Sequence, residues 1–208
     1  RGLGDVYKRQ VTECTTLGKG RLRFHLDNGT ELVLYRGEAK QFRMREGSTL
    51  SDEEEHQLIY EVVGKRAKRR TMHLLEQMDR TEQQLREKLK QGGYPQACID
   101  LALEYVKSFH YVDDYRYACT YINYRQDRMS RYQLKVKLYG KGVSGELIDR
   151  ALEECYEGDE QDQIIRLLEK KKFDAQNSDP KEFTRVYQYL MRRGFRSNDV
   201  LRAMKSKQ

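Results

Sequence analysis

The chain has 208 residues, of which 35% are charged and 38% hydrophobic, and its mean hydropathy is −0.95. So few apolar side chains cannot fill one thick core, and no apolar run is long enough for a membrane span, so a large globular domain and a membrane protein are both excluded. Fifteen tyrosines argue against disorder, while a net charge of +7 favours a polyanionic partner, either nucleic acid or an acidic protein surface.

The first ten residues, RGLGDVYKRQ, do not continue into the pattern that follows them. They resemble translated adapter sequence at the end of a sequencing read. We therefore interpret residues 1–10 as a non-native leader and expect them to lie outside the fold.

Residues 11–50 predict a small β segment. Apolar residues alternate over 22–26 and again over 32–34, and Asn28-Gly29 lies between the two runs. Asn-Gly accepts the two positive φ angles of a type I′ turn, so the sequence predicts a hairpin. Residues 11–15 are a candidate third strand. Because a lone hairpin is marginally stable, we expect this segment to pack on the first helix.

Ser51 begins the helical part of the chain. Ser51 and Glu54 form the capping-box pattern, in which each side chain bonds the backbone N–H of the other residue. Apolar residues with helical spacing follow, so residues 51–64 predict a helical linker.

An internal repeat organises the remainder. Segments 85–103, 134–152 and 186–204 align without gaps, each as a helical pattern, a glycine, an apolar residue and a second helical pattern. A glycine just beyond a helix adopts the left-handed conformation that ends it. These glycines are Gly93, Gly142 and Gly194.

Each copy also follows a capping signal and a further helical segment. One repeat is therefore three helices, too few to bury much surface, so we expect neighbouring repeats to stack and share a core. The predicted fold is mainly α: about nine helices as tandem three-helix repeats in an elongated, curved array, with a small N-terminal β-hairpin segment. The capping signals are Thr81 with Gln84, Ser130 with Gln133, and Asp179 with Pro180 and Glu182. The predicted repeats are 65–112, 113–158 and 159–208.

No catalytic, cofactor or metal motif occurs. The four histidines form no pattern, and no phosphate loop, zinc-protease or nucleophile-elbow motif is found. The four cysteines have no C-x-x-C spacing, so we interpret them as reduced core residues of a cytoplasmic protein. We expect no enzyme, no catalytic residue, no cofactor and no metal.

Basic residues gather in all three repeats, most densely in the second. Contact with a polyanion or an acidic protein and an ordinary solvated face are both open interpretations. Tyr121, Tyr124, Tyr132 and Tyr139 lie among the basic residues of repeat two, and we expect them to pack in its core. The candidate contact residues are Lys65, Arg66, Lys68, Arg69, Arg70, Arg125, Arg128, Arg131, Lys135, Lys137, Lys141, Arg192, Arg193 and Arg196.

The order of several short motifs resembles the RecX family of bacterial regulators of the RecA recombinase. The resemblance spans residues 11–208, and only Met129-Ser130-Arg131-Tyr132 departs from it, where the family usually has a glycine. The motifs are D-R-T-x-x-x-L at 79–85, L-x-x-G-G-Y at 89–94, F-x-Y-V-D-D at 109–114, L-x-x-K-G-V at 138–143 and I-x-x-A-L at 148–152.

The resemblance implies three tandem three-helix bundles and a non-catalytic role in DNA repair, recombination and the SOS response. It implies binding in the groove of the RecA filament on single-stranded DNA, with double-stranded DNA a further candidate partner. It also implies inhibition of strand exchange, ATP hydrolysis and repressor autocleavage. We expect a monomer with no membrane partner.

Two other classes stay open. A helix-turn-helix DNA binder would need a recognition helix with base-reading side chains, whereas the helix after Gly93 in repeat one, ACIDLALEYV, is acidic and apolar. A purely structural scaffold of helical repeats is disfavoured by the basic cluster of repeat two.

Overall fold

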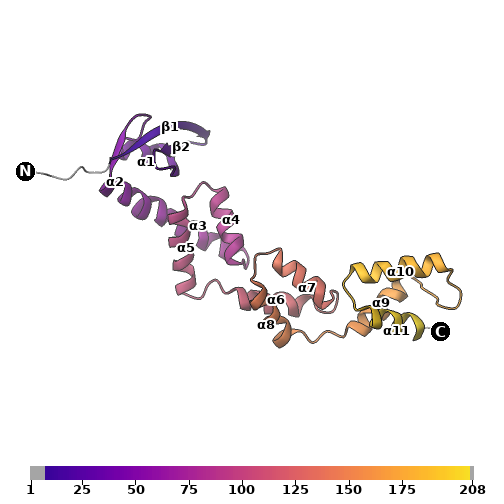
Figure 1. Cartoon of the computed structure of the whole chain (residues 1–208). Helices are drawn as coiled ribbons and strands as arrows, with labels where there is room; N and C mark the ends of the chain where they lie inside the picture. The colour runs from indigo at the N-terminus through magenta and orange to yellow at the C-terminus, as the bar shows by residue number, and fades with distance from the viewer. Residues whose placement is uncertain (1–7, 207–208) are drawn as a thin grey trace, which may run out of the picture. The chain divides into compact units, whose positions relative to one another are not determined.

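A computed structural model of the chain describes residues 8–206. The chain divides into two compact units between Asp113 and Asp114 (Figure 1). The first unit holds a four-stranded sheet and the helices up to α5, and the second holds two groups of three helices. The predicted mainly helical fold with N-terminal strands is confirmed. None of the helices between residues 8 and 206 is both long and apolar enough to cross a membrane.

The sheet is antiparallel throughout, with strand order β3-β2-β1-β4. The predicted hairpin and third strand are confirmed, while β4 and the short helix α1 (Arg36–Gln41) were not predicted. The bounds are β1 Lys8–Gly18, β2 Arg21–Leu26, β3 Glu31–Tyr35 and β4 Thr49–Ser51.

The expectation that residues 1–10 lie outside the fold is wrong for the last three of them. Residues 8–10 begin β1 and pair with residues 49–51 of β4, because β4 offers its backbone groups at the edge of the sheet. Residues 1–7 lie outside the described residues.

The type I′ turn is found at a different hairpin from the predicted one. Lys19 and Gly20, between β1 and β2, have φ angles of 50° and 72°, the two positive values that this turn requires. Between β2 and β3 only Gly29 has a positive φ, and the Asn28 carboxamide oxygen instead accepts a bond from the N–H of Thr30 at 3.0 Å. Because the N–H of Leu26 donates to the carbonyl of Thr30 at 2.9 Å, the loop proper is residues 27–29 and ends in a left-handed glycine, another common hairpin form.

The predicted linker is not separate from repeat one. Helix α2 (Asp52–His56) leads without a break through a π-helical turn, η1 (Gln57–Val63), into α3 (Gly64–Gln77). Ser51 and Glu54 form the predicted capping box. At Gly64 an added Cβ would lie 2.8 Å from Leu101 of α5, so the π turn ends where α3 and α5 come into close contact.

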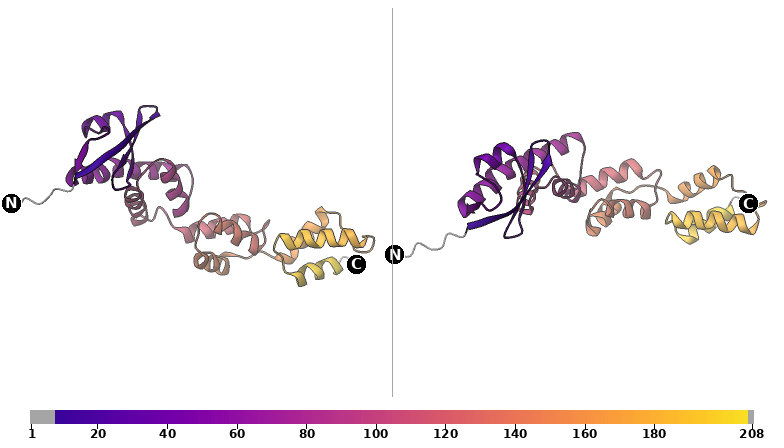
Figure 2. Two further views of the ribbon diagram at one scale, coloured as in Figure 1. Left: turned by 45° about the horizontal axis from the view of Figure 1, so that its top comes forward. Right: turned by 90° about the horizontal axis from the view of Figure 1, so that it is seen from above.

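The nine predicted repeat helices are present, three in each repeat, and Figure 2 shows them from two further directions. Repeat one comprises α3, α4 (Glu82–Gln91) and α5 (Gln96–Ser108). Repeat two comprises α6 (Asp114–Arg125), α7 (Arg131–Tyr139) and α8 (Gly145–Cys155). Repeat three comprises α9 (Glu160–Lys170), α10 (Pro180–Arg192) and α11 (Ser197–Ser206).

The repeat glycines act as helix stops. Gly93, Gly142 and Gly194 have φ angles of 76°, 82° and 80°. After α4 the N–H of Tyr94 donates to the carbonyl of Leu89, and after α7 Val143 donates to Leu138, each at 3.2 Å. With the shorter bonds from the glycines themselves, these form the Schellman arrangement that satisfies the last carbonyls of a helix.

The helix starts are capped as predicted. The side chains of Thr81 and Ser130 accept bonds from Gln84 and Gln133 and complete capping boxes. Asp179 accepts from the N–H of Glu182 at 2.6 Å, and Pro180 takes the first helical position. The sequence therefore places the boundaries of the middle helix in each repeat.

The expectation that neighbouring repeats share a core is wrong. The buried side chains form three separate clusters, one for the sheet with repeat one, one for repeat two and one for repeat three. Leu89, Leu138 and Leu190 occupy equivalent positions and are all fully buried, each in its own cluster. Three short helices thus close a small core by themselves, and only repeat one enlarges its core with an added layer, the sheet.

Polar contacts join repeats two and three. The Ser130 hydroxyl donates to the carbonyl of Arg193, and the Gln163 side chain donates to the carbonyl of Gln126, both at 2.6 Å. The N–H of Arg131 donates to the carboxylate of Glu160 at 2.7 Å. We call this set of contacts the repeat 2–3 joint. It relies on hydrogen bonds to backbone groups and not on a merged core.

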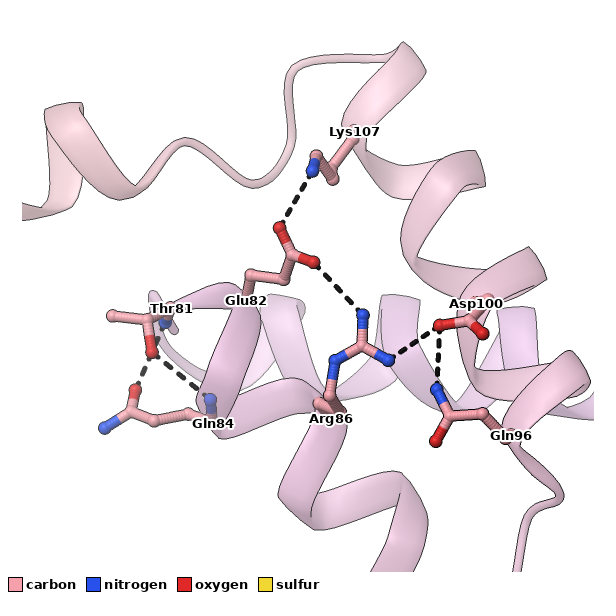
Figure 3. Close-up of polar contacts among 7 residues, drawn as sticks. All are labelled: Thr81, Glu82, Gln84, Arg86, Gln96, Asp100 and Lys107. Carbon is pink, nitrogen blue, oxygen red and sulfur yellow. Dashed lines mark hydrogen bonds and ion pairs between the residues drawn. The ribbon is translucent and has the colours of Figure 1, made fainter. Parts of the chain in front are cut away.

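A polar network crosses repeat one (Figure 3). Arg86 of α4 pairs with Asp100 of α5 at 2.6 Å and with Glu82 at 3.2 Å, and Lys107 reaches Glu82 at 2.8 Å. The hydrogen bond from Arg86 lowers the pKa of Asp100. Repeat two has the same pair at the same aligned positions, Lys135 with Asp149.

Candidate nucleic-acid interface

The basic run at the start of α3 does not act as one surface. Arg66 turns toward the sheet, where its guanidinium pairs with Glu38, donates to the carbonyl of Val33 and lies 5.0 Å from the Tyr35 ring centre and 5.7 Å from that of Tyr94. This side chain is half-buried and ties α3 to the sheet. The structure therefore separates Arg66 from the other candidates.

Three residues of the run line one stripe of α3. Lys65, Lys68 and Arg69 border a pocket of about 480 Å³ whose other wall includes Tyr105 of α5. The Lys68 ammonium lies 5.1 Å from the centre of the Tyr105 ring. Lys65 pairs with Glu61, and its hydrogen bond lowers the pKa of that carboxyl. Arg70 is exposed.

In repeat two, part of the predicted cluster has structural contacts. Lys135 forms the ion pair with Asp149 that corresponds to Arg86–Asp100 in repeat one. The Arg131 guanidinium lies 5.8 Å from the Tyr156 ring centre, next to the repeat 2–3 joint. Reversing either charge would remove a contact within the protein as well as any contact with a partner.

The other four candidate basic residues of repeat two lie outside that ion pair and that joint. Arg125 and Lys141 lie on the ring of Tyr121, at 5.4 and 5.3 Å from its centre. Arg128 and Lys137 are exposed and form no ion pair with any residue between 8 and 206. Arg125, Arg128 and Lys137, which are exposed, make up the accessible part of the predicted basic face away from the joint, and Lys141 is half-buried.

Repeat three adds a smaller group. Arg193 lies 4.8 Å from the Tyr189 ring centre, Arg192 is exposed, and Arg196 shares a pocket of about 320 Å³ with Arg131 and Lys135. That pocket also contains the carboxylates of Asp149, Glu160 and Asp199, so its charge is mixed. The structure brings candidates of repeats two and three together there, but it is not a purely basic site.

The expectation that the tyrosines of repeat two are core residues is wrong for three of the four. Tyr124, Tyr132 and Tyr139 are 83%, 56% and 66% exposed, and only Tyr121 is half-buried. The core of repeat two is filled by aliphatic residues instead. Exposed aromatic rings beside lysine and arginine are a feature of surfaces that bind single-stranded nucleic acid.

The described residues show no arrangement for metal chemistry. Between residues 8 and 206 no three His, Cys, Asp or Glu side chains come together in a way that could hold an ion. All four cysteines are free, and burial raises the pKa of Cys98 to about 12. The expected core placement holds for Cys98, which is buried, whereas the other three cysteines are half-buried.

Family comparisons agree with this arrangement of repeats. Models for the first, second and third three-helix domains of RecX match residues 67–105, 113–152 and 158–204. The chain belongs to the RecX family. The second and third RecX matches coincide with the separate cores of repeats two and three, whereas the first covers the helical part of the core that repeat one shares with the sheet.

Several curated relatives carry the name regulatory protein RecX. That of Caldanaerobacter subterraneus subsp. tengcongensis is 29% identical, over 77% of this chain and 80% of its own length. That of Geobacillus kaustophilus is 33% identical, over 74% of this chain and 59% of its own length. That of Clostridium acetobutylicum is 26% identical over 90% of both chains.

Solved RecX structures share the fold. A crystal structure of a regulatory protein RecX superposes with a TM-score of 0.62 at 21% identity, over 92% of this chain and 96% of that chain. RecX from Lactobacillus salivarius gives a TM-score of 0.60 at 17% identity, over 70% and 96% of the two chains. Similarity at this level establishes the fold of the chain and leaves its contact residues to be argued from its own surface.

Proposed function

We propose that this RecX-family protein is a non-catalytic regulator that binds the RecA filament on single-stranded DNA and inhibits its recombinase, ATPase and co-protease activities. The observation that carries the proposal is the match of all three RecX domains in tandem, in the family's order. The regulatory names of the relatives support the absence of catalysis.

The accessible basic side chains of repeat two are the proposed main contact, with repeats one and three extending it. A RecA filament presents acidic protein surface and DNA phosphates, and both attract arginine and lysine. Each neutralised phosphate releases counterions, so the affinity should fall steeply as salt rises. The separate helical repeats hold these side chains on ordered elements, so little conformational entropy is lost on binding.

The test is ATP hydrolysis by RecA on single-stranded DNA in the presence of charge-reversal variants. The test variant replaces Arg125, Arg128 and Lys137 with glutamate, because these side chains are exposed and form no ion pair among the described residues. Arg131 and Lys135 are left intact because each has a contact within the protein. The inhibitory potency should fall by at least about ten-fold, the factor that 1.4 kcal/mol of lost binding energy gives.

A matched control carries the same change in charge at another place in the same unit. Arg166, Lys170 and Lys181 of repeat three are exposed, lie outside the predicted contact set and form no ion pair among the described residues. Their replacement by glutamate should leave inhibition close to that of the wild type. Equal loss in both triple variants would point to net charge alone, and equal inhibition by all proteins would remove repeat two from the mechanism.

A further inference from the structure

Three aromatic side chains follow one another at the end of α5, on the surface of repeat one. Tyr105, Phe109 and Tyr111 are 38%, 54% and 49% exposed. The rings of Tyr105 and Phe109 meet edge to face with centres 5.1 Å apart, and Phe109 and Tyr111 stack at 5.6 Å with an angle of 18° between their planes. We call these three residues the aromatic ladder.

The ladder is unusual because its rings remain exposed although they contact one another. Monomeric proteins rarely leave adjoining large apolar side chains in water without a partner. The near-parallel Phe109 and Tyr111 rings also present flat faces, which suit a planar ligand better than an irregular apolar chain.

The charge beside the ladder identifies the kind of ligand. Tyr105, the first residue of the ladder, also lines the pocket of about 480 Å³ that Lys65, Lys68 and Arg69 border. The Lys68 ammonium lies over the Tyr105 ring, and Arg69 is exposed without an ion pair among the described residues. One carboxylate, Glu76, also borders the pocket, near His73 at 3.5 Å.

We propose that the aromatic ladder stacks the unpaired bases of single-stranded nucleic acid, while Lys68 and Arg69 hold the adjoining phosphates. A ring platform beside fixed positive charge is how sequence-tolerant single-strand binders work. Duplex bases are already stacked on their neighbours, so they cannot offer their faces to the ladder. The proposal deepens the proposed function and rests on it for the presence of single-stranded DNA, but the contact itself needs no recombinase.

The chain contains no tryptophan, which allows a direct optical test. Phe109→Trp keeps a planar ring in the ladder and adds a single indole reporter. In the absence of RecA, oligo-dT should quench and shift the emission of this tryptophan, as base stacking requires. An abasic oligonucleotide of the same length and a blunt duplex should leave the emission nearly unchanged.

Affinity measurements separate the rings from the charges. In fluorescence anisotropy with labelled oligo-dT, Phe109→Leu together with Tyr111→Leu should weaken binding by about ten-fold or more, with an unchanged salt slope. Lys68→Gln with Arg69→Gln should weaken binding and flatten the salt slope. Tyr60→Leu, at an exposed position of η1 outside the ladder and its pocket, is the control and should bind as the wild type does. Circular dichroism should show equal helicity in every variant.

Three results would overturn the proposal. The first is wild-type protein that does not bind oligo-dT without RecA. The second is binding that leaves the Phe109→Trp emission unchanged. The third is a leucine double variant that binds oligo-dT normally but loses inhibition of RecA, which would make the ladder a protein-docking surface. Each of these leaves the proposed function standing, because that function is measured separately by RecA ATP hydrolysis.

Discussion

At the scale of single residues, Gly194 has two separate reasons to be glycine. Its φ of 80° is strained for any residue with a side chain, and an added Cβ would lie 2.1 Å from the Tyr132 ring. Tyr132 belongs to repeat two, so this glycine both stops α10 and lets the two repeats approach at the repeat 2–3 joint.

A left-handed backbone conformation alone costs an alanine roughly 1–2 kcal/mol. We predict that Gly194→Ala destabilises the second unit by more than this amount. Gly47→Ala is the matched control, since Gly47 has a φ of 78° and no atom within 4 Å of an added Cβ. Urea denaturation followed by circular dichroism gives the free energies of unfolding. In a Tyr132→Ala background the extra cost of Gly194→Ala should disappear, and its persistence would contradict the steric explanation.

The sequence indicates which residues are basic but not which of them are available. Arg66 and Lys135 were predicted to contact a partner molecule. In the structure they pair instead with Glu38 and Asp149, which lie 28 and 14 residues away along the chain. Such pairs depend on tertiary packing and have no local signal. For Lys135 a signal did exist, because the repeat alignment puts it at the position of Arg86 and puts Asp149 at that of Asp100.

At the scale of secondary-structure elements, the Arg86 network links α4 to α5. The hydrogen bond from Arg86, then that from Gln96, lowers the pKa of Asp100. Burial alone would raise the pKa of Glu82. The hydrogen bonds of Glu82 to Lys107 and Arg86 outweigh burial, so the pKa of Glu82 is lowered as well. Both carboxyls therefore stabilise the fold in their ionised form.

We predict that Arg86→Gln costs a few tenths to about 1 kcal/mol at neutral pH, as expected for partly exposed pairs. A lowered carboxyl pKa contributes stability above its unfolded value of 3.8 for Asp100 or 4.5 for Glu82, and this contribution is lost as the pH falls through the folded value. The difference from the wild type should therefore shrink below about pH 4. Lys88→Gln, which removes an exposed charge from the same helix, should show neither effect; identical pH profiles for the two variants would refute the pairing argument.

The repeat helices were predictable from the sequence, whereas the π turn η1 and the strand β4 were not. Apolar spacing, the three caps and the three glycine stops are local signals, and they placed the repeat helices correctly. The π turn at η1 ends beside Gly64, where an added Cβ would lie 2.8 Å from Leu101, and β4 is only three residues long. The apolar spacing of residues 57–63 predicts a helix but not its π form, and three residues are too few to show the alternation of a strand.

At the scale of the whole molecule, the three separate cores imply that stability is local. The core shared by the sheet and repeat one contains many more buried side chains than that of repeat two or repeat three, among the described residues. Since buried apolar area is the main stabilising term, the first unit should resist unfolding more than either later repeat.

We predict that Leu190→Ala and Leu89→Ala destabilise their own cores by similar amounts but affect different parts of the chain. Each truncation of a fully buried leucine should cost about 2–5 kcal/mol. In hydrogen exchange followed by mass spectrometry, Leu190→Ala should speed exchange in α9–α11 and leave the sheet unchanged. Leu89→Ala should speed exchange in α3–α5 and in β2 and β3. Faster exchange throughout the chain in both variants would show that the cores unfold together.

The polar character of the repeat 2–3 joint has a consequence for how such chains change over generations. A core that closes within one repeat does not have to be repacked when a neighbouring copy is gained or lost. The joint requires only a few groups, chiefly the Ser130 hydroxyl on the carbonyl of Arg193 and the Gln163 amide on that of Gln126. Because two of these partners are backbone carbonyls, which every residue type possesses, gene duplication could lengthen this protein by a whole module while most of the side chains remain free to diverge.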